Sequence, residues 1–480
     1  MAAAGTPWRR SAAALLSLSL LLSGCGNSSN GPLTWNPFGP SGPQEGQPGF
    51  VKGFLGGVVA DEPEAALLGR QILSEGGNAA DAAATVGLAL AVTLPSRASL
   101  GSGGACLAYK ASGDDPPQAV MFTSVPPATA AGADRPAAVP MLPRGMFALQ
   151  NRFGHLPFDP LFQQAAQLAS QGVRVSRAFA TDLGVVAGPL AGDPGAAAVF
   201  FHDGHALRDG DLMVQTNLAA TMSELRTTGV GDLYLGALAR RVVALAPAAG
   251  ASLTLTDLRN ALPKITGALS VDAPNGDKVT FLPPPADGGL AAAAAYQVLE
   301  NNPANIQGAD ARGLAVASRW RQGGIDLATI NATASLPPPN LPPLPASTTF
   351  GTFDKDGNAV VCAVTMGNLF GTGRMLSGTG ILLAASPAWL PPPLLAAAMA
   401  YSPRRQAFHV LAGGSGQAGA PLAVAMTISQ TLNGTLAPGS VPDPGRANVI
   451  ACRKYLPGDP AGCAAATDPR GFGLAAGGGN

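Results

Sequence analysis

The chain has 480 residues, enough for two ordinary domains or for one large layered domain. It carries 29 basic and 29 acidic residues, so it offers no basic face for a nucleic-acid backbone, and nucleic acid is not an expected partner. Because 47% of the residues are hydrophobic, a core can form despite 62 glycines and 44 prolines.

Residues 1–24 are typical of a bacterial secretion signal. Two arginines precede an apolar run that is too short to remain as a membrane-spanning helix, and the run ends in the letters LSGC. This ending resembles a lipobox, which implies a lipid on Cys25; an ordinary signal peptide with an incidental cysteine is the alternative. Gly26 favours, by analogy, the outer membrane of the cell envelope, facing the periplasm. Residues 25–50 are rich in Gly, Pro, Asn and Ser, and predict a flexible tether.

The folded body is expected to begin near Val51, with a short strand over 57–60. A helix should follow from Pro63 to Glu75, because proline suits the first turn of a helix and glycines follow its end. A second helix, over 79–93, is almost wholly apolar. We expect it to be buried on all sides, since its length disfavours a membrane span.

The remaining cysteines fall into two pairs of different character. Cys452 and Cys463 bracket a loop rich in Pro and Gly, and a disulfide between them is expected in an oxidising compartment. Cys106 and Cys362 lie in apolar, strand-like runs and are interpreted as small buried hydrophobic residues. The four histidines form no pattern typical of a metal site, so neither a metal nor a cofactor is expected.

A proline-rich connector meets a predicted hairpin at Ser347. The segments 348–353 and 359–365 are rich in Thr, Val and Phe, and the turn between them, DKDGN, contains residues that tolerate positive φ. An N-terminal nucleophile hydrolase needs Ser, Thr or Cys at such a junction, because cleavage before it frees an α-amine that acts as base for the same side chain. The alternative is a polar strand start after a linker.

A glycine-rich turn, GGSGQAG, links a strand over 408–412 to an apolar helix from Pro421. Backbone N–H groups at a helix N-terminus suit an oxyanion hole. A tight packing turn is the alternative for the same residues.

Several runs resemble the γ-glutamyltranspeptidase family: GGNAADAAATVGLALAVTLPSRASLGSGGACLAY, STTFGTFDKDGNAVVCAVTMGNLFGTG and SGTGILL. The resemblance implies an α+β fold, a four-layer αββα sandwich of the N-terminal nucleophile hydrolase type. It also implies a large-subunit-like segment over 51–346 and a small-subunit-like segment over 347–480, which are cut apart yet stay associated in one intertwined domain. The stretch from Val298 to Pro337 is short and featureless compared with the family.

The resemblance also implies roles for individual residues. Ser347 falls on the catalytic nucleophile, with Thr348 next if the alignment slips by one, and Thr365 falls on the threonine that assists it. Gly416 and Gln417 fall on the oxyanion turn. The substrate-binding positions are assigned to Thr123, Asn368 and Trp389.

The chain departs from the family where substrate is held. Thr123 replaces the arginine that pairs with the glutamyl carboxylate, and Trp389 replaces the aspartate that pairs with its amine. The other replacements are Ala397 and Ala398 for two serines, Gly367 for an asparagine, and Gln417 for a glycine. Losing both charged partners removes hydrogen bonds of roughly 1.5–3 kcal/mol each. Weak or absent activity on free γ-glutamyl compounds is therefore expected, with Trp389 and the two alanines lining a more apolar pocket.

The resulting hypothesis is an autoprocessed amide hydrolase or acyltransferase acting on a small amide or γ-glutamyl-like molecule, attached to the membrane only through its lipid. One alternative is a catalytically inactive, lipid-anchored binding protein of the envelope. The other is an unprocessed structural lipoprotein.

Overall fold

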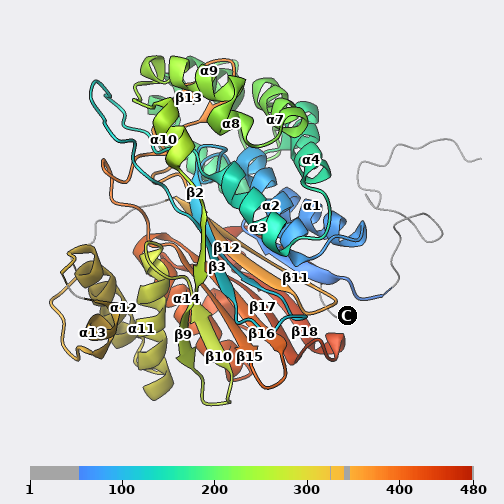
Figure 1. Ribbon diagram of the computed structural model, residues 1–480, viewed down its shortest axis with the longest axis vertical. Coiled ribbons are helices and arrows are strands. Elements are labelled where there is room, and N and C mark those ends of the chain that lie inside the picture. Colours follow the sequence, from blue (N-terminus) through green and yellow to red (C-terminus); the bar gives the residue numbers. More distant parts are fainter. Residues whose placement is uncertain (1–52, 325, 340–345, 478–480) are drawn as a thin grey trace, which may run out of the picture. The chain divides into compact units, whose positions relative to one another are not determined.

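The computed structural model describes residues 53–324, 326–339 and 346–477, all of which belong to one compact unit (Figure 1). The predicted signal segment 1–24, the lipid site Cys25 and the tether 25–50 lie outside the described residues. Within the described ranges, none of the helices is both long and apolar enough to cross a membrane.

Two antiparallel sheets form the centre of the fold. The first sheet has the order β19-β1-β11-β12-β2-β3-β8. Its strands are β19 (Leu474–Gly477), β1 (Gly56–Ala60), β11 (Ser347–Asp354), β12 (Ala359–Thr365), β2 (Gly103–Tyr109), β3 (Gln118–Phe122) and β8 (Lys264–Gly267). The predicted hairpin is the pair β11–β12, in the interior of this sheet and covered by strands on both sides.

The second sheet has the order β18-β17-β16-β15-β10-β9. Its strands are β18 (Cys463–Thr467), β17 (Arg446–Leu456), β16 (Ala407–Ser415), β15 (Ala396–Ser402), β10 (Lys278–Phe281) and β9 (Leu269–Asp272). Three two-stranded ribbons lie outside both sheets: β4 (Val173–Arg174) with β7 (Leu212–Met213), β5 (Phe201–His202) with β6 (His205–Ala206), and β13 (Met375–Leu376) with β14 (Ile381–Leu382).

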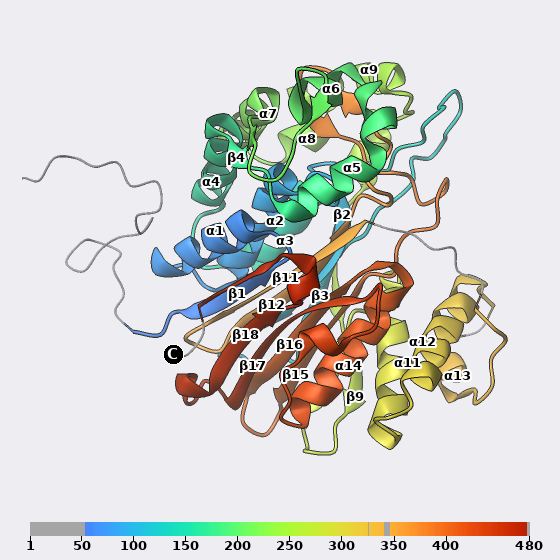
Figure 2. The same ribbon diagram turned by 180° about the vertical axis from the view of Figure 1, so that it is seen from behind.

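Alternating side chains divide the core into three slabs. Val58 and Phe350 face the helices on the outer side of the first sheet. Val59 and Phe353 face the second sheet and meet Leu411 there. The opposite side of the second sheet packs on its own helices, so the described residues form an αββα sandwich (Figure 2). The predicted fold class is confirmed.

Three helices pack on the first sheet (Figure 1): α1 (Pro63–Ser74), α2 (Ala79–Thr93) and α3 (Leu142–Phe153). Helix α4 (Phe158–Gln171) packs on α2. The Asn78 side chain caps α2 by accepting from the N–H groups of Ala80 and Asp81, and the Asp81 carboxylate accepts from the Asn78 N–H. All fifteen residues of α2 are buried, as its composition predicts.

The rest of this helical side consists of α5 (Arg177–Ala191), α6 (Pro194–Phe200), α7 (Thr216–Thr228), α8 (Asp232–Leu235), α9 (Ala237–Leu245) and α10 (Leu255–Asn260).

The second sheet is covered by α11 (Asp287–Asn301) and α14 (Ala420–Leu432), with α12 (Ile306–Arg321) and α13 (Leu327–Ala332) beside them (Figure 2). The expectation that 298–337 is featureless was wrong, because α12 and α13 occupy much of it. The hydrophobic periodicity that would predict this helix is weak, because α12 packs through small residues. A Cβ on Gly313 would lie 2.7 Å from the Ala291 carbonyl oxygen, so the contact depends on close backbone approach and not on large apolar side chains.

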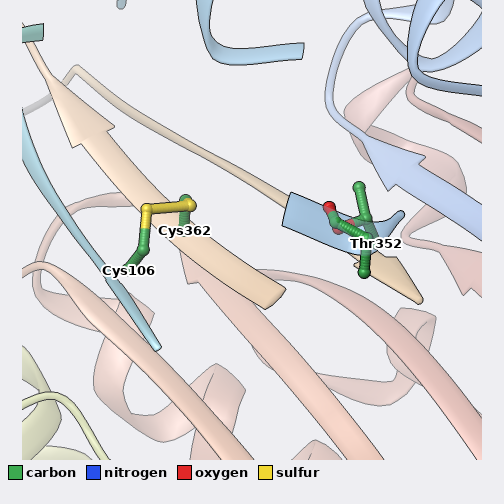
Figure 3. The surroundings of a disulfide bond; sticks show 4 residues. Cys106, Thr352 and Cys362 are labelled. Carbon is green, nitrogen blue, oxygen red and sulfur yellow. A yellow bond between two sulfur atoms is a disulfide. The ribbon is translucent and has the colours of Figure 1, made fainter. Parts of the chain in front are cut away.

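Both pairs of cysteines form disulfides across directly opposed strand positions. Cys452 and Cys463 join β17 to β18, as predicted. Cys106 and Cys362 are fully buried, as expected, but they are also bonded to each other and join β2 to β12 (Figure 3). The sequence interpretation missed this bond because the two residues are 256 positions apart and pair only through the sheet.

Candidate active site

Ser347 is the first residue of β11 and lies directly opposite Thr365, the last residue of β12. It is 4% exposed and lines a pocket of about 450 Å³. Gly416 and Gln417 line the same pocket, although they follow β16 in the other sheet. The fold therefore brings the predicted nucleophile and the predicted oxyanion turn to one cavity, called here the Ser347 pocket.

The peptide before Ser347 is held in an unusual conformation. Ala346 has φ +92°, in a region where a residue with a Cβ is strained by about 1–3 kcal/mol. Its carbonyl oxygen accepts a 2.5 Å hydrogen bond from Thr365 Oγ1. Thr365 Oγ1 in turn accepts from the Gly367 N–H at 2.9 Å, which orients the hydroxyl. Thr365 thus polarises the carbonyl at the predicted cleavage point.

Thr348 has a different environment. The side-chain alternation of β11 turns it away from Ser347, and it is fully buried. Its Oγ1 donates to Asp61 Oδ2 at 2.9 Å, and Asn448 Nδ2 donates to the other oxygen of the same carboxylate at 2.7 Å. These contacts fix Thr348 as part of a buried polar network. The geometry therefore favours Ser347 over Thr348 as the residue that meets a substrate.

The turn after β16 presents two backbone donors. Gly416 and Gln417 both have positive φ, at +96° and +60°. Among the described residues, no backbone carbonyl accepts from either N–H. Both groups are therefore available to an oxyanion in the Ser347 pocket. Gln417 adopts a conformation that glycine would adopt at lower cost, consistent with its replacing a glycine of the family.

Arginines line the Ser347 pocket, but each is already paired. Arg97 donates to both oxygens of Asp182, at 2.7 and 2.8 Å. Burial alone would lower the pKa of Arg97, but the Asp182 carboxylate raises it. Two more arginines at the rim are also bonded to carboxylates, Arg446 to Asp443 and Arg470 to Asp468. The cationic character of this pocket is thus largely neutralised.

A second pocket, of about 470 Å³, adjoins the first at the Ser347–Thr365 pair, because Thr365 lines it. Thr123 and Trp389 also line it, so two of the predicted substrate-binding residues are brought together. Trp389 is 42% exposed and presents apolar surface. This cavity is called here the Trp389 pocket.

Three other residues do not line either pocket. Asn368 is half-buried in the turn after β12, where its carbonyl accepts from the Gly371 N–H, and it is absent from the described residues that line the two cavities. Ala397 and Ala398 were expected to line the substrate pocket, and this was wrong. They belong to β15 and are fully buried, one facing the first sheet and the other the helices.

Sequence reasoning missed a charged pair in the Trp389 pocket. Asp287, the first residue of α11, and Arg321, the last of α12, form a nearly buried ion pair. Burial raises the pKa of Asp287, and the bonds from Arg321 oppose that rise. The sequence analysis did not consider this pair, because Arg321 lies in the stretch interpreted as featureless.

Known proteins resemble this chain in sequence and in fold. The family described as gamma-glutamyltranspeptidase matches residues 65–321, more than half of the chain. The chain is 28% identical over 387 residues to the glutathione hydrolase proenzyme of Escherichia coli K12, covering 69% of this chain and 66% of that protein. It is 29% identical over 272 residues to the acylase ACY 1 proenzyme of Pseudomonas sp. SE83, covering 52% of this chain and 48% of that protein.

The fold has a solved counterpart in the cephalosporin acylase from Bacillus halodurans, with a TM-score of 0.70 and 19% identity, covering 92% of this chain and 99% of that one. At this identity the likeness concerns the fold alone. The chain spans about two thirds or less of the length of the two curated relatives named above.

Proposed function

Since the chain belongs to the gamma-glutamyltranspeptidase family, we propose that it is an autoprocessed amide hydrolase or acyltransferase with Ser347 as nucleophile and an altered substrate pocket. The observation that carries the proposal is the strained Ala346–Ser347 junction, whose carbonyl accepts a hydrogen bond from Thr365 beside a pocket with two open backbone donors.

The first reaction is cleavage of the chain itself. Ser347 Oγ attacks the carbonyl carbon of Ala346, and the peptide C–N bond breaks to leave an ester and a free α-amine on Ser347. Water then hydrolyses the ester, which releases the Ala346 carboxylate. The Thr365 hydroxyl stabilises the developing oxyanion of Ala346, and relief of the strained φ favours the forward direction.

The second reaction uses the amine that cleavage releases. The α-amine of Ser347 takes the proton from Oγ, which attacks the substrate amide carbonyl, and the leaving amine departs with a proton. Gly416 and Gln417 line the same pocket, and their N–H groups, which donate to no backbone carbonyl among the described residues, would hold the oxyanion. Water or a second amine then removes the acyl group, which gives hydrolysis or acyl transfer.

The replacement of both charged glutamyl partners supports an altered substrate choice. Thr123 and Trp389 lie together in the Trp389 pocket, where a carboxylate and an ammonium would otherwise be recognised. We expect weak turnover of a γ-glutamyl anilide, with free glutamate a poor competitor.

The test is to express the full chain, separate it on a reducing denaturing gel and sequence the N-terminus of the smaller fragment. A fragment that begins at Ser347, together with an uncut Ser347→Ala variant, is the expected result. A fragment that begins at Thr348 would move the nucleophile by one residue. A parent chain that stays uncut would reject the catalytic proposal and leave two alternatives, a lipid-anchored binding protein and an unprocessed structural lipoprotein.

We also propose that the mature protein begins at Cys25, carries a lipid there and resides in the bacterial envelope, on the basis of the LSGC ending and the tether composition. Labelling with radioactive palmitate should mark the parent chain and leave Cys25→Ala unlabelled. Equal labelling of both would place the lipid elsewhere, and labelling of neither would favour an ordinary signal peptide.

A further inference from the structure

The Trp389 pocket combines apolar walls with a guanidinium that is fixed in place. Trp320 and Trp389 line it, and prolines from 387 to 393 complete the apolar side. Trp389 keeps 42% of its surface exposed, so the pocket wall presents apolar area to solvent. A flat apolar group would bury this surface.

Arg321 is held on two sides. Its Nε and Nη2 donate to the two oxygens of Asp287, and Nη2 also donates to the Pro392 carbonyl at 2.9 Å. Within the described residues, nothing accepts from Nη1. The N–H groups of Nη1 are therefore preorganised donors on a side chain that has already lost its rotational freedom.

A further polar group in the pocket is unpaired. Ser124 Oγ is buried and has no hydrogen-bond partner among the described residues. A buried hydroxyl without a partner costs about 1–3 kcal/mol. The Ser124 oxygen is not accessible from the cavity, so the donor that the pocket offers beside its apolar walls is the fixed guanidinium of Arg321.

We propose that the Trp389 pocket binds the acyl part of the substrate, and that this acyl group has a flat, aromatic body and an oxygen acceptor at its far end that bonds to Arg321 Nη1. This inference rests on the proposed function, because it assigns the substrate class of the Ser347 nucleophile. Thr365 lines the pocket and lies opposite Ser347, so an acyl group seated there has its reacting end near the nucleophile.

The experiment compares three 4-nitroanilides on the processed protein: 3-phenylpropanoyl, 3-(4-carboxyphenyl)propanoyl and γ-glutamyl. We expect kcat/KM to be highest for the carboxyphenyl compound and lowest for the γ-glutamyl compound. A matching 4-acetylphenyl compound distinguishes a carboxylate from a neutral carbonyl as the preferred acceptor. Equal rates for the phenyl and both substituted compounds would contradict the role of Arg321.

Two variants test the pocket residues, and a third serves as a control. The double change Asp287→Leu with Arg321→Met removes the ion pair without leaving a buried charge, and should lower the preference for the acceptor-bearing compounds about 10- to 100-fold. Arg319→Met removes a charge from the same helix but outside the pocket, and should change nothing. Trp389→Ala, at an exposed position where folding is not at risk, should raise KM for all aromatic compounds about tenfold.

The outcomes separate the two proposals. A protein that is cut before Ser347 and hydrolyses the anilides, but is indifferent to Trp389 and to the Asp287–Arg321 pair, would overturn only this inference. A protein that remains uncut would overturn the proposed function and the substrate assignment together.

Discussion

The nucleophile hairpin and the Trp389 pocket meet at Thr365 but are built in different ways. In the hairpin, every functional position follows from the register of two neighbouring strands, and the hydroxyls of Thr348, Thr352 and Thr365 each donate to a fixed partner. In the pocket, the side chains come from five separate segments, and the buried Ser124 hydroxyl has no hydrogen-bond partner among the described residues. The difference indicates that the hairpin serves a fixed, intramolecular reaction, whereas the pocket is completed by a ligand.

The largest effect is expected at Thr365, where the hairpin touches the cleavage point. Thr365→Val keeps the shape but removes the hydroxyl that bonds to the Ala346 carbonyl. Losing one oxyanion donor should slow chain cleavage about 100- to 1,000-fold, measured as the rate at which the smaller fragment appears on a reducing gel.

The matched control is Thr352→Val on the same hairpin. Thr352 Oγ1 donates to the Ala79 carbonyl at 2.6 Å, so this variant also loses one buried hydrogen bond. Thr352, labelled in Figure 3, lies five positions along β11 from Ser347. It should lose about 1–2 kcal/mol of stability and keep its cleavage rate. If both variants slowed cleavage equally, the effect of Thr365 would be a matter of stability alone.

The second effect concerns how the hairpin is attached to the rest of the sheet. Cys106 lies in the large segment and Cys362 in the small one, so the disulfide should keep the two fragments covalently joined after cleavage. A processed sample should run as one band without reductant and as two with it. Replacing both cysteines by alanine should give two bands in either case and cost about 3 kcal/mol of stability.

The other disulfide supplies the control, because Cys452 and Cys463 both lie in the small segment. Replacing that pair should leave the single unreduced band intact. Two bands from the processed parent without reductant would show that Cys106 and Cys362 are not bonded.

The hairpin could be predicted from the sequence, whereas the disulfide that joins it to β2 could not. The Thr-, Val- and Phe-rich segments 348–353 and 359–365, with the DKDGN turn between them, predict a hairpin, and the family resemblance adds Ser347 and Thr365. The Cys106–Cys362 bond was missed because it depends on β2 being the next strand in the sheet, which no local pattern specifies.

The pocket could be predicted less well, for a physical reason. Trp389 and Thr123 were placed by counting along motifs, but Arg321 reaches the same cavity only because α12 packs closely on α11 through Gly313. Such a contact depends on backbone approach between small residues, which leaves little trace in hydrophobic periodicity. The two alanines at 397 and 398 were misplaced since strand neighbours point to opposite faces.

The third effect lies beside the hairpin network, at Glu62, which follows Asp61 and caps α1. Burial raises its pKa from 4.5 to about 7, although its hydrogen bonds oppose the rise. The folded state therefore holds the proton more tightly than the unfolded state. Stability from this group is complete below pH 4.5 and is lost as the pH rises through about 7.

The variant Glu62→Gln should be more stable than the parent at pH 8 by roughly 2–3 kcal/mol and should equal it near pH 4. Urea unfolding at both pH values provides the measurement. Glu64, next in α1 and more exposed, serves as a comparison, since Glu64→Gln should show a smaller dependence of the same sign. A Glu62→Gln difference that did not change with pH would assign the effect to packing.

The smallest effect is expected at Gln417, which lines the Ser347 pocket. Its φ of +60° suits glycine, so Gln417→Gly should stabilise the fold by about 0.5–1 kcal/mol after the greater freedom of an unfolded glycine is subtracted. Gln406, with φ +50° in the turn between β15 and β16, is the matched control for backbone strain outside the pocket. Gln406→Gly should gain less stability, because it also loses the hydrogen bond that the Gln406 side chain donates to the Pro403 carbonyl. Only the change at 417 should alter kcat, because Gln417 lines the Ser347 pocket and Gln406 does not. A rise in stability with unchanged kcat would mean that the turn holds the same geometry with either residue, and that the strain at 417 has no part in catalysis.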